Sequence, residues 1–278
     1  LLAHWADPAD RGRVYGFHRA MDHAGAVVGP LVATVFLLAA PGHYRTLFLL
    51  TAIPGAIAVA LVWRVRDVDA DALPSRERFE PRATHIDVQG VPPTPVRLPR
   101  AFFAYAAVVA IFTLGNSSDA FLLLRLTEAA GGPALIPLVW ALLHVVKSAL
   151  STPGGALSDR VGRKPVLVAS WVVYGIVYAG FASSESFIAL TLWLLVYGVH
   201  FALAEGTEKA MVADLAPASL RGTAFGIFHG IIGFGSLAAS VVFGLVWRAW
   251  GAPAAFGLGA SLALAASVLL LTAVRPEA

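Results

Sequence analysis

The chain has 278 residues, of which 58% are hydrophobic and only 13% are charged. Soluble domains carry roughly a quarter charged residues, so this composition excludes an ordinary soluble globular protein. The formal net charge is +3, and the positive side chains lie in short segments between long apolar runs, which predicts a membrane protein rather than a nucleic-acid-binding one.

Eight apolar runs have about the 17 to 25 residues that a helix needs to cross a hydrocarbon core. They lack the alternation of apolar and polar residues that a membrane β-barrel requires, and residues 187–199, FIALTLWLLVYGV, are apolar on every face. The predicted fold class is therefore an all-α polytopic membrane protein. The predicted spans cover residues 12–40, 47–63, 101–124, 133–151, 165–183, 187–213, 222–247 and 254–274.

The distribution of Arg and Lys predicts the orientation, because cytoplasmic segments carry an excess of basic residues. One set of alternate segments holds most of the basic residues outside the spans; it comprises 1–13, 64–100, 152–164, 214–221 and the tail from 274. The other set holds only Arg45, Arg125 and Arg248. We therefore expect both ends of the chain to be cytoplasmic, in what we interpret as a bacterial inner membrane.

The first predicted span carries ionisable side chains, which are costly within a bilayer and default to functional candidates. His18, Arg19 and Asp22 share a face at helical spacing, whereas His23 is expected to point elsewhere. Asp22 lies about 15 Å from the helix entry at Gly12, near mid-depth. Arg19 and Asp22 either line a cavity or form a self-contained ion pair. No signal peptide precedes this span, and we expect the chain to begin in mid-protein.

Residues 64–100 form one long polar segment rich in Pro and Arg, which predicts a flexible cytoplasmic linker. The linker divides residues 1–63, with two spans, from residues 101–278, with six. Residues 3–25 also resemble residues 213–235, with an Arg-Gly-x-x-x-Gly pattern in both. Parallel repeats of this kind are typical of transporters built from two similar halves.

Two polar clusters occur early in the second part of the chain. Asn116 and Asp119 lie toward the outer end of the span 101–124, and they either break the helix and line an outer vestibule or simply end it. His144 and Lys147 share a face of the span 133–151. Lys147 is close enough to the cytoplasmic end to extend its ammonium to the surface, and this interpretation is preferred over a functional one.

The span 187–213 contains a polar stripe with His200, Glu205, Glu208 and Lys209. Glu205 precedes Lys209 by four residues, the favourable order for an ion pair, and it lies near mid-depth. Glu205 and Glu208 are the preferred candidates for a substrate or proton pathway, with a structural salt bridge as the alternative. His229 is expected to be a packed histidine. The histidines are scattered and the chain has no cysteine, so no metal site, disulfide or cofactor is predicted.

The stretch from Gly155 to Lys164 reads Gly-x-x-x-Asp-Arg-x-Gly-Arg-Lys between two apolar runs. It resembles the signature loop of the major facilitator superfamily, which follows the second helix of each half. The resemblance implies twelve helices in two six-helix halves, with the first span here similar to the family's fifth helix and the last to its twelfth. About four helices would then lie upstream. The sequence GAVVGP, with Gly25, Gly29 and Pro30, resembles a helix-packing motif of the fifth helix.

The residues of this stretch suggest a cytoplasmic latch. Gly155 would let two helices approach closely, Gly162 would permit a left-handed turn, and Asp159 would accept hydrogen bonds from backbone N–H groups at a neighbouring helix start. The basic residues would face lipid head groups or acidic partners. The predicted members are Gly155, Asp159, Arg160, Gly162, Arg163, Lys164 and Arg221. Membrane anchoring is the simpler alternative, but it leaves Asp159 and the glycines unexplained.

These features together predict a secondary transporter that moves a small solute by alternating access between two halves. Protons are a candidate coupling ion through Asp22, Glu205 or Glu208, and no ATP-binding loop is present in the sequence. The expected partners are the lipid bilayer, a small solute and protons, with no nucleic acid, and the full-length protein is expected to be monomeric. A non-transporting sensor or assembly module on the same fold and a membrane-embedded enzyme are the alternatives.

Overall fold

The computed structural model describes residues 6–64, 96–132 and 135–273, and every regular element within these ranges is a helix. The chain divides into two compact units. The larger comprises residues 1–30 and 96–278, and the smaller comprises residues 31–95. Of the expected linker 64–100, residues 65–95 lie outside the described ranges.

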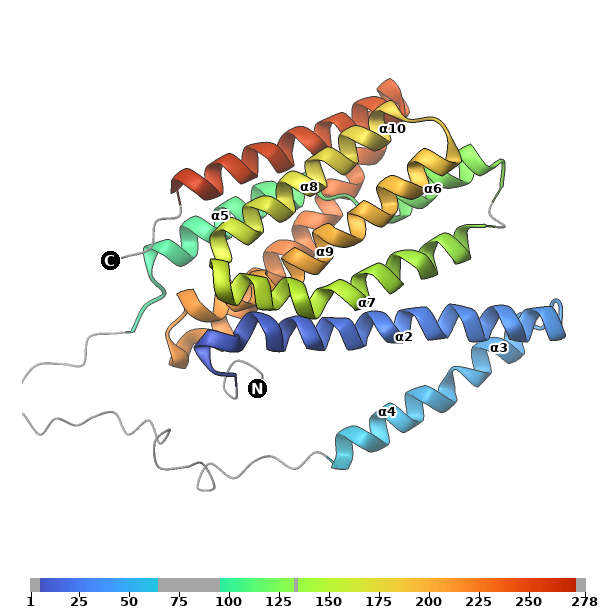
Figure 1. Cartoon of the computed structure of the whole chain (residues 1–278), viewed down its shortest axis with the longest axis horizontal. Helices are drawn as coiled ribbons and strands as arrows, with labels where there is room; N and C mark the ends of the chain where they lie inside the picture. Colours follow the sequence, from blue (N-terminus) through green and yellow to red (C-terminus); the bar gives the residue numbers. More distant parts are fainter. Residues whose placement is uncertain (1–5, 65–95, 133–134, 274–278) are drawn as a thin grey trace, which may run out of the picture. The chain divides into compact units, whose positions relative to one another are not determined.

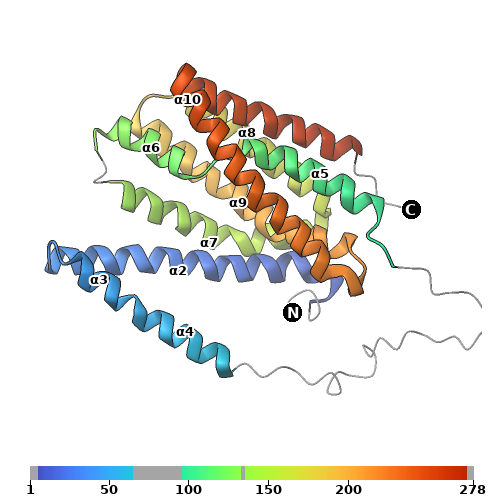
Figure 2. The same ribbon diagram turned by 180° about the vertical axis from the view of Figure 1, so that it is seen from behind.

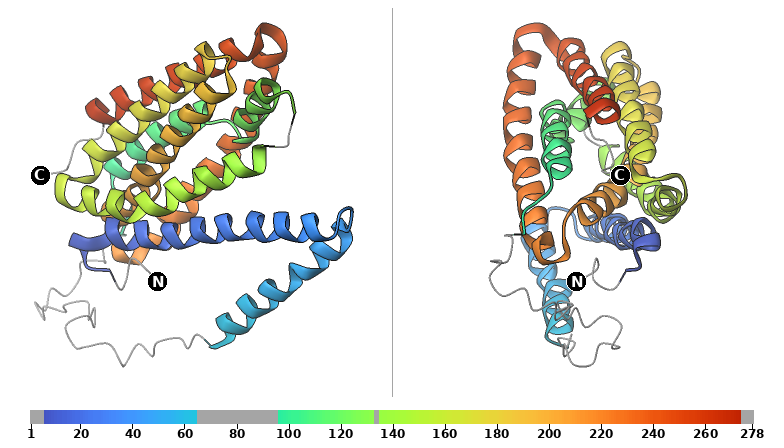
Figure 3. Two further views of the ribbon diagram at one scale, coloured as in Figure 1. Left: turned by 45° about the vertical axis from the view of Figure 1, so that its right-hand side comes forward. Right: turned by 90° about the vertical axis from the view of Figure 1, so that its left-hand side faces the viewer.

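The larger unit holds most of the helices (Figure 1). In chain order they are η1 (Pro8–Asp10), the first part of α2 (Arg11–Ala39), α5 (Arg100–Gly115), α6 (Ala120–Ala130), α7 (Ile136–Val161), α8 (Arg163–Ser183), α9 (Phe187–Leu215), η3 (Ala218–Leu220) and α10 (Arg221–Ala273). The helix α10 packs against α5 and α8, and α9 packs against α7 and α8. Figure 3 shows α5 beside the two limbs of α10.

Aromatic side chains fill the core of the larger unit. Phe112 of α5 stacks on Trp171 of α8 with ring centroids 4.6 Å apart, and Tyr174 stacks on Tyr178 at 4.1 Å. Trp171, Tyr174 and Tyr178 are fully buried. Large stacked rings of this kind exclude water and fix the packing of α5 against α8.

The smaller unit contains the end of α2, α3 (Tyr44–Leu50) and α4 (Ala52–Arg64). The residues of α4 are apolar yet none of them is buried. Apolar side chains that are exposed along a whole helix are expected where the surrounding medium is lipid.

Six helical stretches are long and apolar enough to cross a membrane: 45–64, 100–130, 136–161, 163–183, 187–215 and 218–273. The last contains two limbs, because Gly251 has φ 85° and ψ 171° and breaks α10; Figure 2 shows α10 turning back at this break. The two limbs correspond to the predicted spans 222–247 and 254–274. The 29-residue helix α2 corresponds to the predicted span 12–40.

Two predicted boundaries are wrong in an informative way. The span 101–124 is broken after Gly115 and resumes as α6, so Asn116 to Asp119 interrupt the helix rather than end it. The span 133–151 continues to Val161, so most of the signature stretch is the last turns of α7 and not a loop. Hydropathy did not predict this part of the helix, because residues 151–160 are mostly small or polar. Such residues suit a helix that packs closely against other helices instead of facing lipid.

Candidate functional site

A cavity of about 200 Å³ lies within the larger unit. Its wall combines aromatic and apolar side chains with both signs of charge. The lining residues belong to α2, α5, α9 and α10, together with Asn116, which directly follows α5. They are Arg19, Val109, Phe112, Thr113, Asn116, His200, Phe201, Ala204, Glu205, Glu208, Lys209, Phe228, His229 and Ile232. A few polar groups in a largely apolar pocket are typical of a small-molecule site.

Glu205 is the centre of the polar side of the cavity. Its Oε2 atom lies 2.9 Å from Nε2 of His23 and 3.6 Å from Nε of Arg19, so two residues of α2 hold one carboxylate of α9. The ion pair between Glu205 and Lys209, which was the alternative to a functional role, is absent from the described residues, because His23 and Arg19 contact the carboxylate instead.

Arg19 also forms the ion pair with Asp22 that its helical spacing predicted, with Nη1 3.1 Å from Oδ2. His18 lies 3.6 Å from the same carboxylate. Both His18 and Asp22 are exposed by about half. Asp22 is not among the residues that line the cavity, so Arg19 is the member of this pair that reaches it.

Glu208 and Lys209 line the cavity from the next turn of α9. Glu208 accepts a hydrogen bond from the indole Nε1 of Trp171 at 3.3 Å. Trp171 also stacks on Phe112 of the cavity wall, so the same ring supports the wall and orients the carboxylate.

His144 and Lys147 are both buried, at 7% and 3% exposure. The prediction that Lys147 extends to the cytoplasmic surface is wrong. Its Nζ lies 3.2 Å from the ring centroid of Phe201, with Trp140 at 5.8 Å and Tyr197 at 5.9 Å. Rings around an ammonium replace part of its hydration by cation–π attraction, which explains why this side chain remains inside.

Two further candidate site residues lie at the break between α5 and α6. Asn116 lines the cavity, and Asp119 accepts a hydrogen bond of 2.8 Å from the hydroxyl of Tyr197. His200 is buried, with Nδ1 2.8 Å from the Ser170 hydroxyl, although its ring also borders the cavity. His229 lies at the cavity wall, and its ring stacks with Phe225 at 6.2 Å.

Helices α2 and α7 meet along an antiparallel seam, which we define by the residue pairs Gly12–Gly155, Gly16–Ser151, Ala20–Ser148 and His23–His144. A Cβ on Gly12 or Gly155 would collide with the backbone of the other, and one on Gly16 would collide with the Ser151 carbonyl. The hydroxyl of Ser148 donates to the Ala20 carbonyl at 2.9 Å. The glycines therefore allow a backbone-to-backbone approach that larger residues would prevent.

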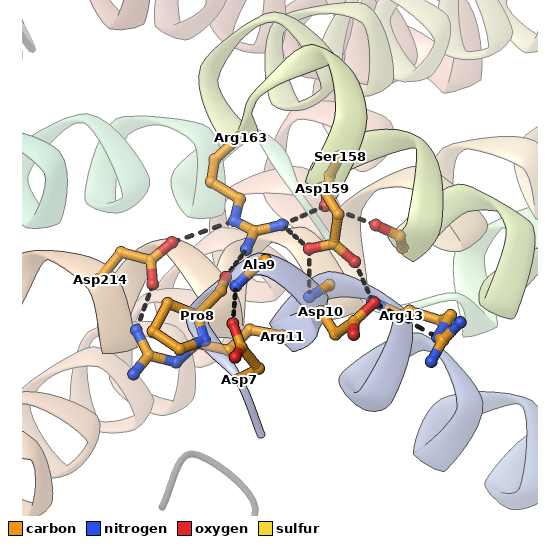
Figure 4. A network of polar contacts seen from close by, with 12 residues as sticks. Asp7, Pro8, Ala9, Asp10, Arg11, Arg13, Ser158, Asp159, Arg163 and Asp214 are labelled. Atoms are coloured by element: carbon orange, nitrogen blue, oxygen red, sulfur yellow. Dashed lines mark hydrogen bonds and ion pairs between the residues drawn. The ribbon is translucent and has the colours of Figure 1, made fainter.

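At one end of this seam a dense polar network joins α2, α7 and α9 (Figure 4). The carboxylate of Asp159 accepts hydrogen bonds of 2.8 Å from the backbone N–H groups of Gly12 and Arg13, in the first turn of α2. This is the contact with a neighbouring helix start that the sequence suggested. An anion at this position is favoured by the unpaired N–H groups and by the helix dipole.

Arg163 joins Asp159 to a second carboxylate. Its Nη1 contacts Asp159 and donates to the Ser158 hydroxyl at 2.9 Å, and its Nε lies 3.0 Å from Oδ2 of Asp214. Asp214 also pairs with Arg11 of α2 at 2.5 Å. Two acids and two arginines therefore alternate across the junction (Figure 4), which leaves each charge opposite a partner.

The other expected latch residues take different places. Gly162 has φ 103° and ψ 153° between α7 and α8, a positive φ that favours glycine but not the left-handed helical turn expected. Lys164 donates to the Leu271 carbonyl at 2.8 Å, and Arg221 donates to the Ala213 carbonyl at 3.3 Å. Arg160 is exposed at the end of α7.

Among the described residues, the close contacts of α2 lie outside the predicted helix-packing motif. A Cβ on Gly25 or Gly29 would meet nothing within 4 Å, and Pro30 lies inside the helix. The close approaches occur at Gly12 and Gly16 instead. The motif rests on resemblance alone, which does not say which neighbour each glycine faces.

Sequence reasoning missed His23, Arg11 and Asp214. His23 was expected to point away from the functional face, yet it lies four residues after Arg19, and this spacing places both on the side that holds Glu205. Arg11 belongs to the Arg-Gly-x-x-x-Gly repeat. The repeat draws attention to this segment, but it does not indicate that Arg11 pairs with Asp214. Nothing in the sequence singles out Asp214 before the fold places it between Arg11 and Arg163.

The fold and the site together describe a helical membrane protein whose internal cavity has a charged and aromatic wall. The family model of the Major Facilitator Superfamily matches residues 1–144 and 120–278. The chain belongs to this superfamily of membrane transporters, which makes it an integral membrane protein and sets aside a membrane-embedded enzyme.

Several curated proteins are similar to the chain. An uncharacterized MFS-type transporter of Methanocaldococcus jannaschii is 32% identical over 270 residues, which cover 95% of this chain and 64% of that protein. An uncharacterized protein of Mycobacterium tuberculosis is 28% identical over 89% of this chain and 59% of its own length. A proton myo-inositol cotransporter of Caenorhabditis elegans is 28% identical over 55% of this chain and 27% of its own length. The chain thus spans less than two thirds of the length of these relatives.

Proposed function

We propose that the protein is a secondary active transporter that moves a small solute by alternating access, with protons as the coupling ion. The observation that carries this proposal is the cavity, because Arg19, Glu205, Glu208 and Lys209 line it beside aromatic rings. Intramembrane charges of both signs around one cavity are expected for a path that binds and releases a polar solute. The likeness to a proton myo-inositol cotransporter supports proton coupling.

The network at the start of α2 supports a conformational role in the same cycle. Asp159, Arg163, Asp214 and Arg11 connect α2 to α7, α8 and α9. In this proposal the network is a latch that stabilises one conformation and opens when α2 moves away from α7. The excess of basic residues in these segments supports a position of the network on the cytoplasmic side, and the proposed membrane is a bacterial inner membrane.

The same proposal includes the domain organisation. Residues 1–63 supply two helices of one half, residues 64–100 are a cytoplasmic linker, and residues 101–278 form the other half. The transporter works as a monomer in the lipid bilayer, because its cavity is built between helices of one chain.

A flux measurement with a panel of solutes tests the function. The protein is reconstituted into liposomes that contain a pH-sensitive dye, and sugars, polyols, amines, carboxylates and amphipathic drugs are added in turn. We expect at least one compound to produce a proton flux together with its own uptake. Uptake that does not depend on the pH gradient would overturn proton coupling. A failure to take up any compound of the panel would overturn the transport function.

Substitution of the carboxylates then locates the coupling. Glu205→Gln and Glu208→Gln are expected to abolish or strongly reduce gradient-driven uptake, because each removes a charge from the cavity wall. Asp22→Asn is the matched control on α2, since Asp22 pairs with Arg19 outside the cavity wall. Unchanged coupling in both glutamate variants would contradict the proposed pathway.

A further inference from the structure

The seam between α2 and α7 ends at a pair of histidines. From Gly12–Gly155 the contacts continue through Gly16–Ser151 and Ala20–Ser148 to His23–His144. Two residues farther along α2, a Cβ on Gly25 would meet nothing within 4 Å. The pair therefore stands at the limit of the close contact, and any separation of the two helices in the middle of α2 has to break it.

The contact between the two rings requires one hydrogen between their Nδ1 atoms. Nδ1 of His23 lies 3.2 Å from Nδ1 of His144, and Nε2 of His23 lies 2.9 Å from Oε2 of Glu205. An ionised Glu205 only accepts hydrogen bonds, so His23 carries its proton on Nε2 toward it. A hydrogen bond between the two Nδ1 atoms then requires a proton on one of them and a lone pair on the other.

Protonation of both rings is incompatible with this arrangement. When both rings are imidazolium, each Nδ1 carries a hydrogen and each ring a positive charge, so the contact becomes repulsive. Both histidines are buried at 7% exposure, which weakens the screening of this repulsion by water.

The charged groups around the pair come from every helix that packs on it. On α2, Arg19 and Asp22 pair with each other, and on α7, Lys147 lies one turn from His144. On α9, Glu205 contacts His23, and Asp119 at the start of α6 is the next carboxylate toward Lys147. Among the described residues, Glu205 is the carboxylate that touches the pair directly, so the pair connects to the cavity through it.

We propose that His23 and His144 form a proton-binding gate between α2 and α7. A hydrogen on one of the two Nδ1 atoms holds the two helices together at this level, and protonation of both rings to imidazolium separates them. The inference deepens the proposed function and rests on it, because it assigns the coupling proton to a histidine pair that reports to the cavity through Glu205. It also explains why an otherwise small-residue seam ends on two imidazoles.

The separation can be measured without any solute. The chain has no cysteine, so Met21→Cys with Val145→Cys gives two unique labelling sites that are exposed beside the seam. We would measure the distance between spin labels at these sites by double electron–electron resonance in lipid. Because both rings have to be protonated, a longer distance population is expected to grow as the solution is acidified in steps from about pH 8 to about pH 4.

Two variants and one control assign the change to the pair. In His144→Gln the side-chain amide donates to His23 without taking up a proton, so the short distance should persist at both pH values. His23→Gln provides a second variant in case the first does not fold, and the same loss of pH dependence is expected. His18→Gln is the matched control, because His18 lies on the same helix as His23, is exposed by about half and belongs neither to the seam nor to the cavity wall, and it should keep the pH-dependent shift.

The outcomes separate the gate from the transport function. No shift with intact histidines, or a shift that persists in His144→Gln and His23→Gln, would overturn the gate. Since no solute is present in the measurement, a gate that opens in a protein that transports no compound of the panel would leave this inference standing. A protein that transports but shows no shift would overturn the gate alone.

Discussion

Helix α2 contacts the rest of its unit through two polar sites of different chemistry. At its start, Asp159 accepts two backbone hydrogen bonds and pairs with Arg163, so the contact consists of a carboxylate, a guanidinium and backbone N–H groups. At its middle, His23 connects Glu205 to His144 through imidazole rings, which can take up protons. The first site is suited to hold α2 in place and the second to respond to protons.

The largest effect is expected from Asp159, because its carboxylate is the acceptor at the start of α2. Asp159→Ala would leave two N–H groups of α2 and the guanidinium of Arg163 without this acceptor. Removing one partner from a buried charged network costs about 3 to 5 kcal/mol. We expect a lower thermal midpoint of the purified protein and a larger fraction with α2 detached, measured by spin-label distances.

Arg160→Gln is the control for this prediction, since Arg160 is the neighbouring residue and is exposed. It should leave the midpoint nearly unchanged. If Asp159→Ala and Arg160→Gln lowered the thermal midpoint equally, stability would depend on the charge at this end of α7 in general and not on the specific contact of Asp159 with α2.

A second prediction compares Gly155, which lies within the seam between α2 and α7, with Gly25, which lies beyond the end of the seam. Gly155→Ala places a Cβ against the backbone of Gly12, and overpacking of this kind costs about 1 to 3 kcal/mol. Gly25→Ala should be neutral or slightly stabilising, because a Cβ there meets open space and alanine favours the helix. Thermal unfolding of the two variants side by side checks the contrast, and a destabilised Gly25→Ala would contradict it.

The third prediction concerns the buried ammonium. Phe201→Leu keeps an apolar side chain of similar reach but removes the ring 3.2 Å from Nζ of Lys147. The lost cation–π contact is expected to cost about 1 to 2 kcal/mol. Phe103→Leu, at an exposed position of α5, is the control. If Lys147 instead extended to the surface, the two variants would unfold at the same temperature.

The smallest effect is expected at Glu208. Trp171→Phe preserves an aromatic ring next to Phe112 but removes the indole donor to the carboxylate. The loss of one hydrogen bond corresponds to about 1 kcal/mol. Near-normal stability with a changed pH profile of solute uptake is the expected result, since Glu208 stays in the cavity wall with one donor fewer. An unaltered profile would argue against an orienting role for Trp171.

Local pattern was enough for much of the fold. Hydropathy located the helices, and the break at Asn116–Asp119 and the extension of α7 to Val161 changed only where they begin and end. The contact of Asp159 with a helix start was also suggested by the motif. Its glycine allows a second helix to approach closely, and the carboxylate can then accept hydrogen bonds from the N–H groups at the start of that helix. Pairings between distant helices did not follow. For that reason the prediction for Lys147 was wrong, and the alternative of a Glu205–Lys209 ion pair is not found among the described residues.

The sequence by itself determined a bundle of membrane helices with charges at defined depths, because helical periodicity and apolar length are properties of neighbouring residues. Only the tertiary structure decided which charges meet. Glu205 could have paired with Lys209 on its own helix, but the close packing of α2 brings His23 and Arg19 to it instead. A side chain within a bilayer takes the partner that helix packing places within reach, and that choice is made by residues far apart in the chain.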